Sequence, residues 1–363
     1  MDTSRRRFLS ALAGAVLTPQ VLSAQQATGT SAGTEGSLPK FARIDTHAHV
    51  MNHSPQFYAM LKRQNMHLLD INTIARFDRG QEGLEPQQTQ ALEAVKKSNG
   101  WLAWCSTFDP VEWEHPGFAD GVIEHLNWTF DQGAIAVKMW KEIGMLIVGQ
   151  TGKYLMPDDP VFDPILDDLQ RRGKTLVCHF ADEDDAWEPL DPNGSTYPYF
   201  RDWPMWHMYL FPDRPKKAAI LAARDRLVAR HPHLRIVGCH LASMERDLDG
   251  LADRLDRYPN LAVDTAAEML ALLMLPREKV RAFMTKYQDR VLYGTDLGYH
   301  PWEQAEEVVK AWESRYSLEW RLFSTDETFN LKDHEVRGLA LPESVLRKIY
   351  YENAVKWLPG IVG

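Results

Sequence analysis

The sequence predicts an α/β protein, a (β/α)8 TIM barrel, from two observations. First, from residue 41 onward, short apolar runs that suit β-strands alternate with amphipathic stretches that suit α-helices, as in repeated βα units around a parallel sheet. Second, eight such units follow one another within roughly 250 residues, which is the size of a TIM barrel. The strand-like runs are 41–44, 66–74, 101–108, 134–140, 174–180, 235–241, 261–265 and 290–295.

Each element follows from its local pattern. Several of the strand-like runs are almost continuously apolar, which is typical of parallel strands that are buried on both faces. Between them, apolar residues recur at spacings of three and four, which predicts helices. The clearest helices cover residues 87–97, 164–172, 216–230, 243–258 and 276–287.

Two segments are additions to the eight βα units of a minimal barrel. Residues 182–215 form a long loop after the fifth strand, rich in proline, tyrosine and tryptophan, at the end of the barrel where active sites lie. This loop is either a cap over the pocket or the dimerisation arm of a homo-oligomer, because interfaces also favour Tyr and Trp. Residues 318–363 form a C-terminal helical extension, in which Pro342 and the following apolar periodicity predict a closing helix packed on the barrel.

The N-terminus predicts export by the twin-arginine pathway. Three consecutive arginines precede an apolar stretch over residues 9–22 and a run of small residues. That stretch is shorter than the roughly 20 residues of a spanning helix and contains Pro19, so we expect a cleaved signal rather than an anchor. The chain then divides into a signal peptide (1–26), a flexible linker (27–38) and the barrel domain (39–363), and we expect a periplasmic or secreted protein without membrane integration after cleavage.

Charge and cysteine content restrict the partners. The formal net charge of −9, with no basic cluster after Arg7, argues against nucleic acid and anionic membrane surfaces and leaves a small molecule as the expected substrate. Three cysteines are too few, and odd in number, for a disulfide framework. Because Cys178 and Cys239 each precede a histidine at a strand end, alternation predicts that their thiols point away from it, toward the helical layer.

Side chains of the types that ligate metals stand at the ends of four of the eight predicted strands. Alternation along the first strand places His47 and His49 on one face, aimed into the barrel mouth. His179 closes the fifth strand, His240 the sixth and Asp296 the eighth. Each residue alone has a structural explanation, such as a helix cap for Asp296, but their joint placement at the catalytic face predicts a metal site.

This constellation resembles the amidohydrolase superfamily, most closely its amidohydrolase-related (amidohydrolase 2) branch of metal-dependent TIM barrels, over residues 40–360. The resemblance is carried by Asp45-Thr46-His47-Ala48-His49, Val237-Gly238-Cys239-His240-Leu241 with Met244-Glu245, Val263-Asp264-Thr265 and Tyr293-Gly294-Thr295-Asp296. It implies that one divalent metal ion, commonly zinc, is held by His47, His49, His179 and Asp296. It also implies that His240 faces the substrate or a second ion.

Lys138, at the end of the fourth predicted strand, leaves two alternatives open. Some branches of the superfamily place a carboxylated lysine there that bridges two metal ions, in which case His179 and His240 would serve the second ion. Otherwise the lysine is unmodified and pairs with Asp182 or Glu183, or binds a substrate carboxylate. We favour this second alternative, with a single ion.

The expected chemistry follows from such a site. A divalent ion lowers the pKa of bound water from 15.7 toward about 7 and so supplies a nucleophile. Asp296 would act as general base and then acid, and His240 would polarise the substrate. We therefore predict a hydrolase that cleaves a C–N or C–O bond of a small amide, lactone or ester. The alternatives are a decarboxylase or other lyase, which needs a cation such as Lys138 or Arg201 near the substrate carboxylate, and a non-catalytic ligand-binding barrel.

Loop residues are the remaining candidates. In the long loop, Arg201, Trp203 and Trp206 are expected to select the substrate, since Arg201 suits a carboxylate through bidentate contacts. Asp109, after the third strand, is expected to cap the turn at Pro110. The sequence has no glycine-rich phosphate loop, no Gly-x-Ser-x-Gly elbow and no cysteine-based metal finger, which argues against kinase, serine-hydrolase and zinc-finger functions.

Overall fold

The computed structural model describes residues 39–73, 84–331 and 334–362. Its main sheet has nine parallel strands in the order β8-β7-β6-β5-β4-β3-β2-β1-β9. They are β1 (Arg43–Val50), β2 (Met66–Ile71), β3 (Leu102–Thr107), β4 (Ala136–Met139), β5 (Thr175–Cys178), β6 (Arg235–Gly238), β7 (Leu261–Asp264), β8 (Val291–Leu292) and β9 (Leu297–Tyr299). β1 extends beyond the predicted run and includes both histidines of the first motif.

The sheet closes on itself at residues 291–299. β8 pairs with β7, and β9 pairs with β1. Between these two short strands, Tyr293 O accepts a hydrogen bond from Thr46 N (2.9 Å) and Asp296 N donates one to His47 O (2.8 Å), so the segment between them is also joined to β1. The segment therefore serves as the eighth barrel strand, and the chain folds as the predicted TIM barrel. The predicted eighth run, 290–295, contains only β8, and β9 lies beyond its end.

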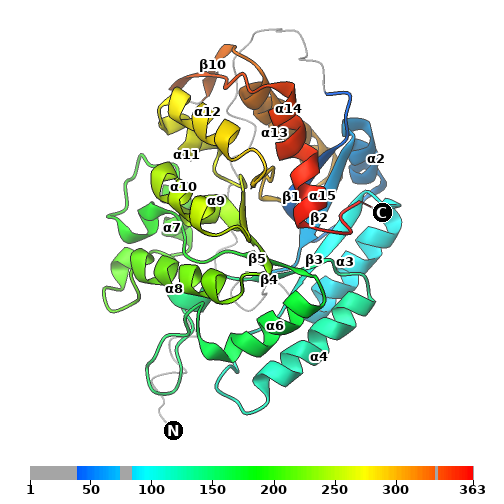
Figure 1. The fold of residues 1–363 in the computed structure, drawn as a ribbon. Helices are drawn as coiled ribbons and strands as arrows, with labels where there is room; N and C mark the ends of the chain where they lie inside the picture. The colour runs from blue at the N-terminus through cyan, green and yellow to red at the C-terminus, as the bar shows by residue number, and fades with distance from the viewer. Residues whose placement is uncertain (1–38, 74–83, 332–333, 363) are drawn as a thin grey trace.

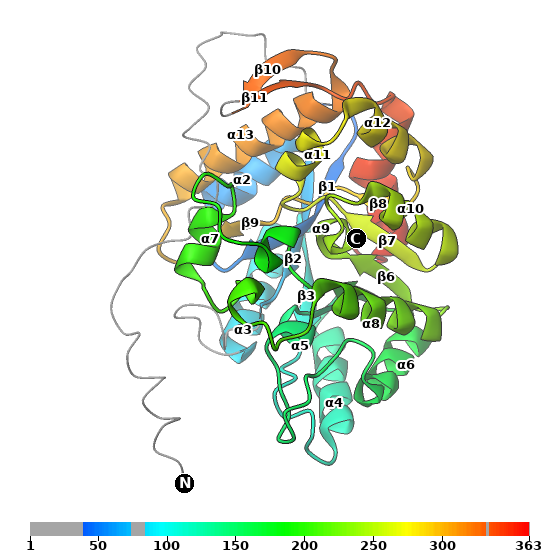
Figure 2. The ribbon, with the colours of Figure 1, turned by 90° about the vertical axis from the view of Figure 1, so that its left-hand side faces the viewer.

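Helices surround the strands in both views of the ribbon (Figures 1 and 2). The longer ones are α2 (Pro55–Gln64), α3 (Leu84–Ser98), α4 (Phe118–Asp131), α6 (Asp163–Arg171), α8 (Lys217–Arg230), α10 (Leu248–Arg257), α12 (Arg277–Lys286) and α13 (Ala305–Ser324). Short helical turns are α5 (Glu142–Met145), η3 (Pro160–Phe162), η4 (Asp184–Trp187), α7 (Tyr197–Asp202), η5 (Met208–Leu210), α9 (Cys239–Ser243) and α11 (Met269–Met274).

Four of the five helices singled out in the sequence, which became α3, α6, α8 and α12, lie within three residues of their predicted ends. The fifth, predicted over 243–258, begins only at Leu248. The reason is local: residues 240–243 have a left-handed backbone, and Asp247 caps the helix by accepting a hydrogen bond from Gly250 N.

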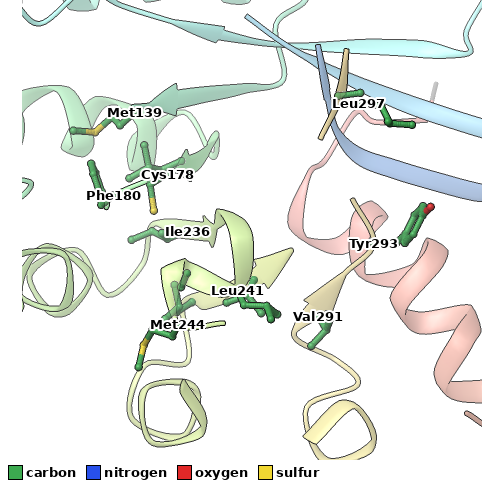
Figure 3. Close-up of a cluster of buried hydrophobic side chains, with 14 of the residues drawn as sticks. Met139, Cys178, Phe180, Ile236, Leu241, Met244, Val291, Tyr293 and Leu297 are labelled. Carbon is green, nitrogen blue, oxygen red and sulfur yellow. The ribbon is translucent and has the colours of Figure 1, made fainter. Parts of the chain in front are cut away.

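Buried apolar side chains form two clusters that alternate along the strands. One contains Val177, Val237, Ala262 and Leu292 but no residue from the surrounding long helices, so it fills the barrel interior. The other lies between strands and helices and includes Met139, Cys178, Ile236 and Val291 (Figure 3). Alternation along each strand thus decides which side chains point into the barrel and which point toward the helices.

The C-terminal closing helix is present as one helical run, α14 (Glu343–Arg347), η6 (Lys348–Glu352) and α15 (Asn353–Trp357). Ala354 and Trp357 belong to the interior cluster, and Trp357 O accepts a hydrogen bond (2.5 Å) from Thr175, the first residue of β5. The helix therefore plugs the barrel at the amino ends of the strands. A hairpin of β10 (Thr328–Leu331) and β11 (His334–Arg337), which the sequence did not predict, precedes it.

Replacing Trp357 with Ala is expected to lower the free energy of unfolding by about 3–5 kcal/mol, because it leaves a cavity in the barrel interior. Urea unfolding followed by circular dichroism measures this change. Val355→Ala, at an exposed position of the same helix, is the control and is expected to change the value by less than about 0.5 kcal/mol. Equal effects of the two variants would contradict the interior position of Trp357.

The export predictions concern a part of the chain that the structure does not reach. The predicted signal peptide (1–26) and linker (27–38) lie outside the described residues, as does the last residue of the predicted run 66–74. Among the helices of the described residues, none has the length and apolar character needed to cross a membrane.

Candidate metal centre

Three of the predicted ligands converge where β1 meets the β8–β9 segment. The Nε2 atoms of His47 and His49 approach Asp296 Oδ1, at 3.3 Å and 3.1 Å. Asp296 lies in the turn between β8 and β9. Its backbone is left-handed (φ 62°), a conformation that aspartate tolerates better than most residues. Two residue groups in the described part of the chain have metal-ligand atoms within 4.8 Å of one another, and these three residues form one of them.

Hydrogen bonds to neighbouring oxygens occupy the Nδ1 atom of each histidine. His47 Nδ1 lies 2.9 Å from Asp264 Oδ2, at the end of β7, and His49 Nδ1 lies 2.7 Å from Ile71 O. Burial raises the pKa of Asp264, but the charge and hydrogen bond of His47 outweigh it and lower that pKa to about 2, so Asp264 is an ionised acceptor. Since neither acceptor can donate, each Nδ1 carries a proton, and Nε2 is the atom of each ring that can ligate a metal ion.

The charges and spacing of these groups suit a divalent cation. Burial and the nearby Lys138 ammonium lower the pKa of His47 to about 4, so its imidazole is neutral at pH 7. Burial opposes ionisation of Asp296, but the hydrogen bond with His49 and the charge of His47 hold its pKa well below the usual range. The two distances from Asp296 Oδ1 to the histidine nitrogens, 3.3 and 3.1 Å, are close to the edge of a tetrahedron with bonds of roughly 2.0–2.1 Å, which is the geometry of zinc.

His240 and His179 continue the site. The ring centroids of His47 and His240 are 4.8 Å apart, and those of His240 and His179 are 4.3 Å apart. His240 Nδ1 donates to Ala266 O (2.8 Å), so its Nε2 is free as well. The predicted fourth ligand, His179, stands beside His240 and outside the three-residue group, with its Nε2 3.5 Å from Asp182 Oδ1.

Lys138 is fully buried beside these histidines. Its Nζ lies 2.8 Å from Cys239 Sγ, 3.4 Å from His47 Nε2 and 4.8 Å from the centroid of a Trp140 ring. The predicted pairing with Asp182 is wrong, because Asp182 forms its ion pair with Lys141 (2.5 Å). The position of Lys138 suits both a bridging carboxylated lysine and an ammonium that faces the substrate.

The prediction for Cys239 is also wrong. Its thiol points at Lys138 inside the barrel, because Cys239 follows Val237 by two residues and both belong to the interior cluster. Cys178 does face the helical layer, as predicted (Figure 3). His240 consequently reaches the barrel mouth through the left-handed backbone of residues 240–243 and not through strand alternation.

The long loop is docked on Lys141, just after β4. Lys141 Nζ contacts both carboxylate oxygens of Asp182 (2.5 and 2.6 Å) and Tyr199 OH (2.7 Å), and it lies 4.5 Å from a Trp206 ring centroid. Asp182 in turn neighbours His179. These buried contacts connect the loop to the histidines and favour the cap, while a dimerisation arm stays a prediction.

The three loop residues expected to select the substrate are placed differently. Trp206 is buried against Lys141, and Trp203 is half-buried against the apolar cluster between strands and helices. Arg201 is exposed, and its guanidinium pairs with Asp202 (2.7 Å). Asp109 accepts a hydrogen bond from Val111 N (3.0 Å) and so caps the turn as predicted. Trp206 approaches the site through Lys141, which pairs with Asp182 beside His179.

Asp264 is the functional candidate that sequence reasoning missed. One of its carboxylate oxygens accepts from His240 N (2.8 Å) and the other from His47 Nδ1, so it links two histidines from different strands. Its signal was present in the sequence: it ends β7 and follows Ala262, which points into the barrel, by two residues.

Comparison with known families decides the relationship. A family model described as Amidohydrolase matches residues 44–360, which span the barrel and all the residues of the site. The chain belongs to the amidohydrolase family. Members of this family are generally metal-dependent, which agrees with the group formed by His47, His49 and Asp296. No curated protein matches the chain significantly.

Solved structures share the fold of this amidohydrolase. A TIM-barrel protein from Bordetella bronchiseptica superposes with a TM-score of 0.52 at 12% identity, over 88% of this chain and 99% of that one. A 2,6-dihydroxybenzoate decarboxylase from Rhizobium superposes with a TM-score of 0.51 at 13% identity, over 87% of this chain and 98% of that one. At these identities the likeness concerns the fold alone.

A buried network behind β1 holds the amidohydrolase centre together. Asp45 accepts hydrogen bonds from the backbone nitrogens of His47 and Thr295 (both 3.1 Å), and also from Thr295 Oγ1 (2.6 Å) and Tyr316 OH (3.1 Å). This single carboxyl group therefore ties the strand that carries two ligands to the turn that carries Asp296 and to α13.

Asp70→Asn is expected to stabilise the protein at alkaline pH. Asp70 is buried on β2, where Oδ1 accepts from Val50 N (2.8 Å) and Oδ2 has no hydrogen-bond partner among the described residues. Burial raises its pKa from 3.8 to about 7. The native state therefore binds this proton more tightly than the unfolded chain does, so the cost of the carboxyl group is small below pH 4, grows between pH 4 and 7, and is constant above.

We expect the free energy of unfolding of this variant to exceed that of the wild type by up to about 4 kcal/mol at pH 8, and the two values to approach each other near pH 4. Urea unfolding at both pH values measures the difference. A difference that does not change with pH would contradict the assignment of the raised pKa to Asp70.

Proposed function

We propose that this amidohydrolase is a metal-dependent hydrolase that cleaves a C–N or C–O bond of a small amide, lactone or ester. The observation that carries the proposal is that Asp296 Oδ1 lies 3.3 Å from His47 Nε2 and 3.1 Å from His49 Nε2, while both Nδ1 atoms are hydrogen-bonded elsewhere. We propose zinc as the ion that these three residues hold. If a second ion binds, its ligands would be His179 and His240, with Lys138 as the bridge.

A divalent cation in this position would acidify water and polarise a carbonyl oxygen. The chain's own residues would do the rest. Asp296, whose side chain is 31% exposed, is the most accessible of the three and can take a proton from the attacking water and return it to the leaving group. His240 can accept a proton at Nε2, and once protonated it can donate a hydrogen bond to the developing oxyanion. The docked loop would limit the access of bulk water.

A decarboxylase or other lyase is the second candidate. The buried amine of Lys138, 3.4 Å from His47 Nε2, favours it, because an ammonium there can bind a substrate carboxylate. Release of carbon dioxide from a carboxylated substrate would identify this reaction, and its absence would leave hydrolysis. Arg201, paired with Asp202 at the surface, is the weaker candidate for that carboxylate.

We further propose that the enzyme acts outside the cytoplasm, in the periplasm or after secretion, on a small molecule. The support is the arginine-led apolar N-terminus, which is typical of a twin-arginine signal. Fractionation of cells that carry the chain with and without Arg5 and Arg6 replaced by Lys tests this localisation.

Metal removal tests the proposed function. Protein purified without chelators is expected to contain about one zinc ion per chain, and to hydrolyse members of a panel of nitrophenyl esters, lactones and anilides. Chelation should abolish this activity and zinc should restore it. His47→Ala/His49→Ala should lose the ion, whereas His233→Ala, at an exposed position, should keep it. Two ions would assign the bridge to Lys138, and neither ion nor turnover would favour a ligand-binding barrel.

A further inference from the structure

The turn that carries His240 has an unusual backbone. His240, Leu241, Ala242 and Ser243 all have φ angles between 50° and 57°, in the left-handed region. A non-glycine residue populates the left-handed region roughly five- to thirtyfold less than the right-handed one. Four such residues in succession therefore require contacts from outside the turn.

Arg224, on α8, provides the first contact. Its side chain is almost fully buried, Nη1 donates to the carbonyl oxygen of Ala242, and Nη2 lies 3.6 Å from Met244 Sδ. Asp225 Oδ1 accepts from the same guanidinium (2.8 Å), and Arg254 donates to the other oxygen of Asp225 (2.8 Å). The guanidinium is therefore held in place and already aimed at the turn.

Ser243 and Leu241 provide the others. Ser243 Oγ lies 2.7 Å from Ala181 O and 3.0 Å from Phe180 O, directly after His179. The Leu241 side chain is buried in the apolar layer that also contains Phe180 and Met244 (Figure 3). The turn is thus bound on its apolar side, at a carbonyl group and at a hydroxyl group, and its imidazole is left facing the barrel mouth.

We infer that Arg224 and Ser243 are positioning residues for His240: they hold the left-handed turn so that its imidazole stands between His47 and His179. They act through the backbone of the turn and do not touch the reacting atoms. The effect on catalysis rests on the proposed function, whereas the positioning itself is a property of the metal-free chain.

The protonation of the His240 ring reports this positioning without any substrate. In metal-free protein labelled with 15N-histidine, long-range 1H–15N spectra should show His240 as a single tautomer protonated at Nδ1, the atom that donates to Ala266 O. His240→Asn identifies the resonance. Arg224→Met should convert it to an average of both tautomers, and Ser243→Ala should do the same. Arg226→Met, at an exposed position of the same helix, is the matched control and should leave the spectrum unchanged.

A rescue separates positioning from general damage. Adding Ala242→Gly to Arg224→Met should restore the single tautomer, because glycine adopts the left-handed conformation without penalty. On a hydrolysed nitrophenyl ester, kcat should fall by about 10–100-fold in Arg224→Met with little change in KM, and recover in the double variant.

A wild-type tautomer spectrum in folded Arg224→Met, or no recovery with Ala242→Gly, would overturn the inference. If Arg224→Met does not fold, an unchanged spectrum in Ser243→Ala overturns it instead. Absence of turnover in the wild type would refute the proposed function and leave the spectroscopic result standing.

Discussion

Asp296→Asn is expected to lower kcat/KM by about 10³-fold or more while the protein keeps its fold. The amide has nearly the same shape as the carboxylate, but it carries no charge for a cation and cannot act as a general base, a role that alone contributes about 10²–10⁴-fold. His47 and His49, which now meet a charged carboxylate oxygen at 3.3 and 3.1 Å, would meet a neutral amide group instead. Steady-state kinetics with added zinc and metal analysis by mass spectrometry measure both losses.

Asp109→Asn is the matched control for Asp296→Asn. Asp109 also follows a barrel strand, but its Oδ1 accepts from Val111 N, and an amide oxygen can replace it there. We expect its kcat/KM to stay within about threefold of the wild type, as for substitutions that keep their hydrogen bond. If Asp296→Asn binds zinc and loses less than tenfold in rate, proton transfer must belong to another residue.

Asp264→Asn should have the second largest effect, although Asp264 is not proposed to touch the metal. An Asn amide group turned toward His47 would donate to Nδ1 and so move the imidazole proton to Nε2, where it blocks the lone pair that the ion needs. In the Ser-His-Asp triad the same change, through the wrong tautomer, costs about 10⁴-fold. We expect zinc affinity to fall by about 100-fold, measured by titration against a competing chelator.

The pH dependence of this variant has a defined sign. Because the folded state lowers the pKa of Asp264 to about 2, the stabilisation that its carboxylate contributes is present above pH 4 and is lost as the pH falls through 2. Asp264→Asn should therefore be less stable than the wild type at pH 7, and its stability should approach that of the wild type in acid.

Asp70→Asn is the control for zinc affinity, because it alters a buried carboxyl group on β2 without changing the partner of either histidine. Equal zinc affinities in the two variants would contradict the tautomer argument.

The sequence by itself determined the barrel and the strand ends at which the candidate ligands stand. Both depend on local signals: the period of the apolar pattern separates strands from helices, and parallel strands present all their carboxyl ends on one side. His47, His49 and Asp296 could therefore be assigned to one place before any contact was known. The same reasoning would have reached Asp264. It stands two residues after Ala262, and residues two apart on a strand point to the same side, here the barrel interior.

Only the tertiary structure decided which atoms meet. The partner of Lys138 is Cys239 and not Asp182, because the parity of β6 turns the thiol inward and Lys141 stands closer to Asp182. His240 enters the site through a left-handed turn that is held by Arg224, a residue in another element. A backbone conformation that its own residues disfavour leaves no local signal, because its energy is supplied by contacts between distant parts of the chain.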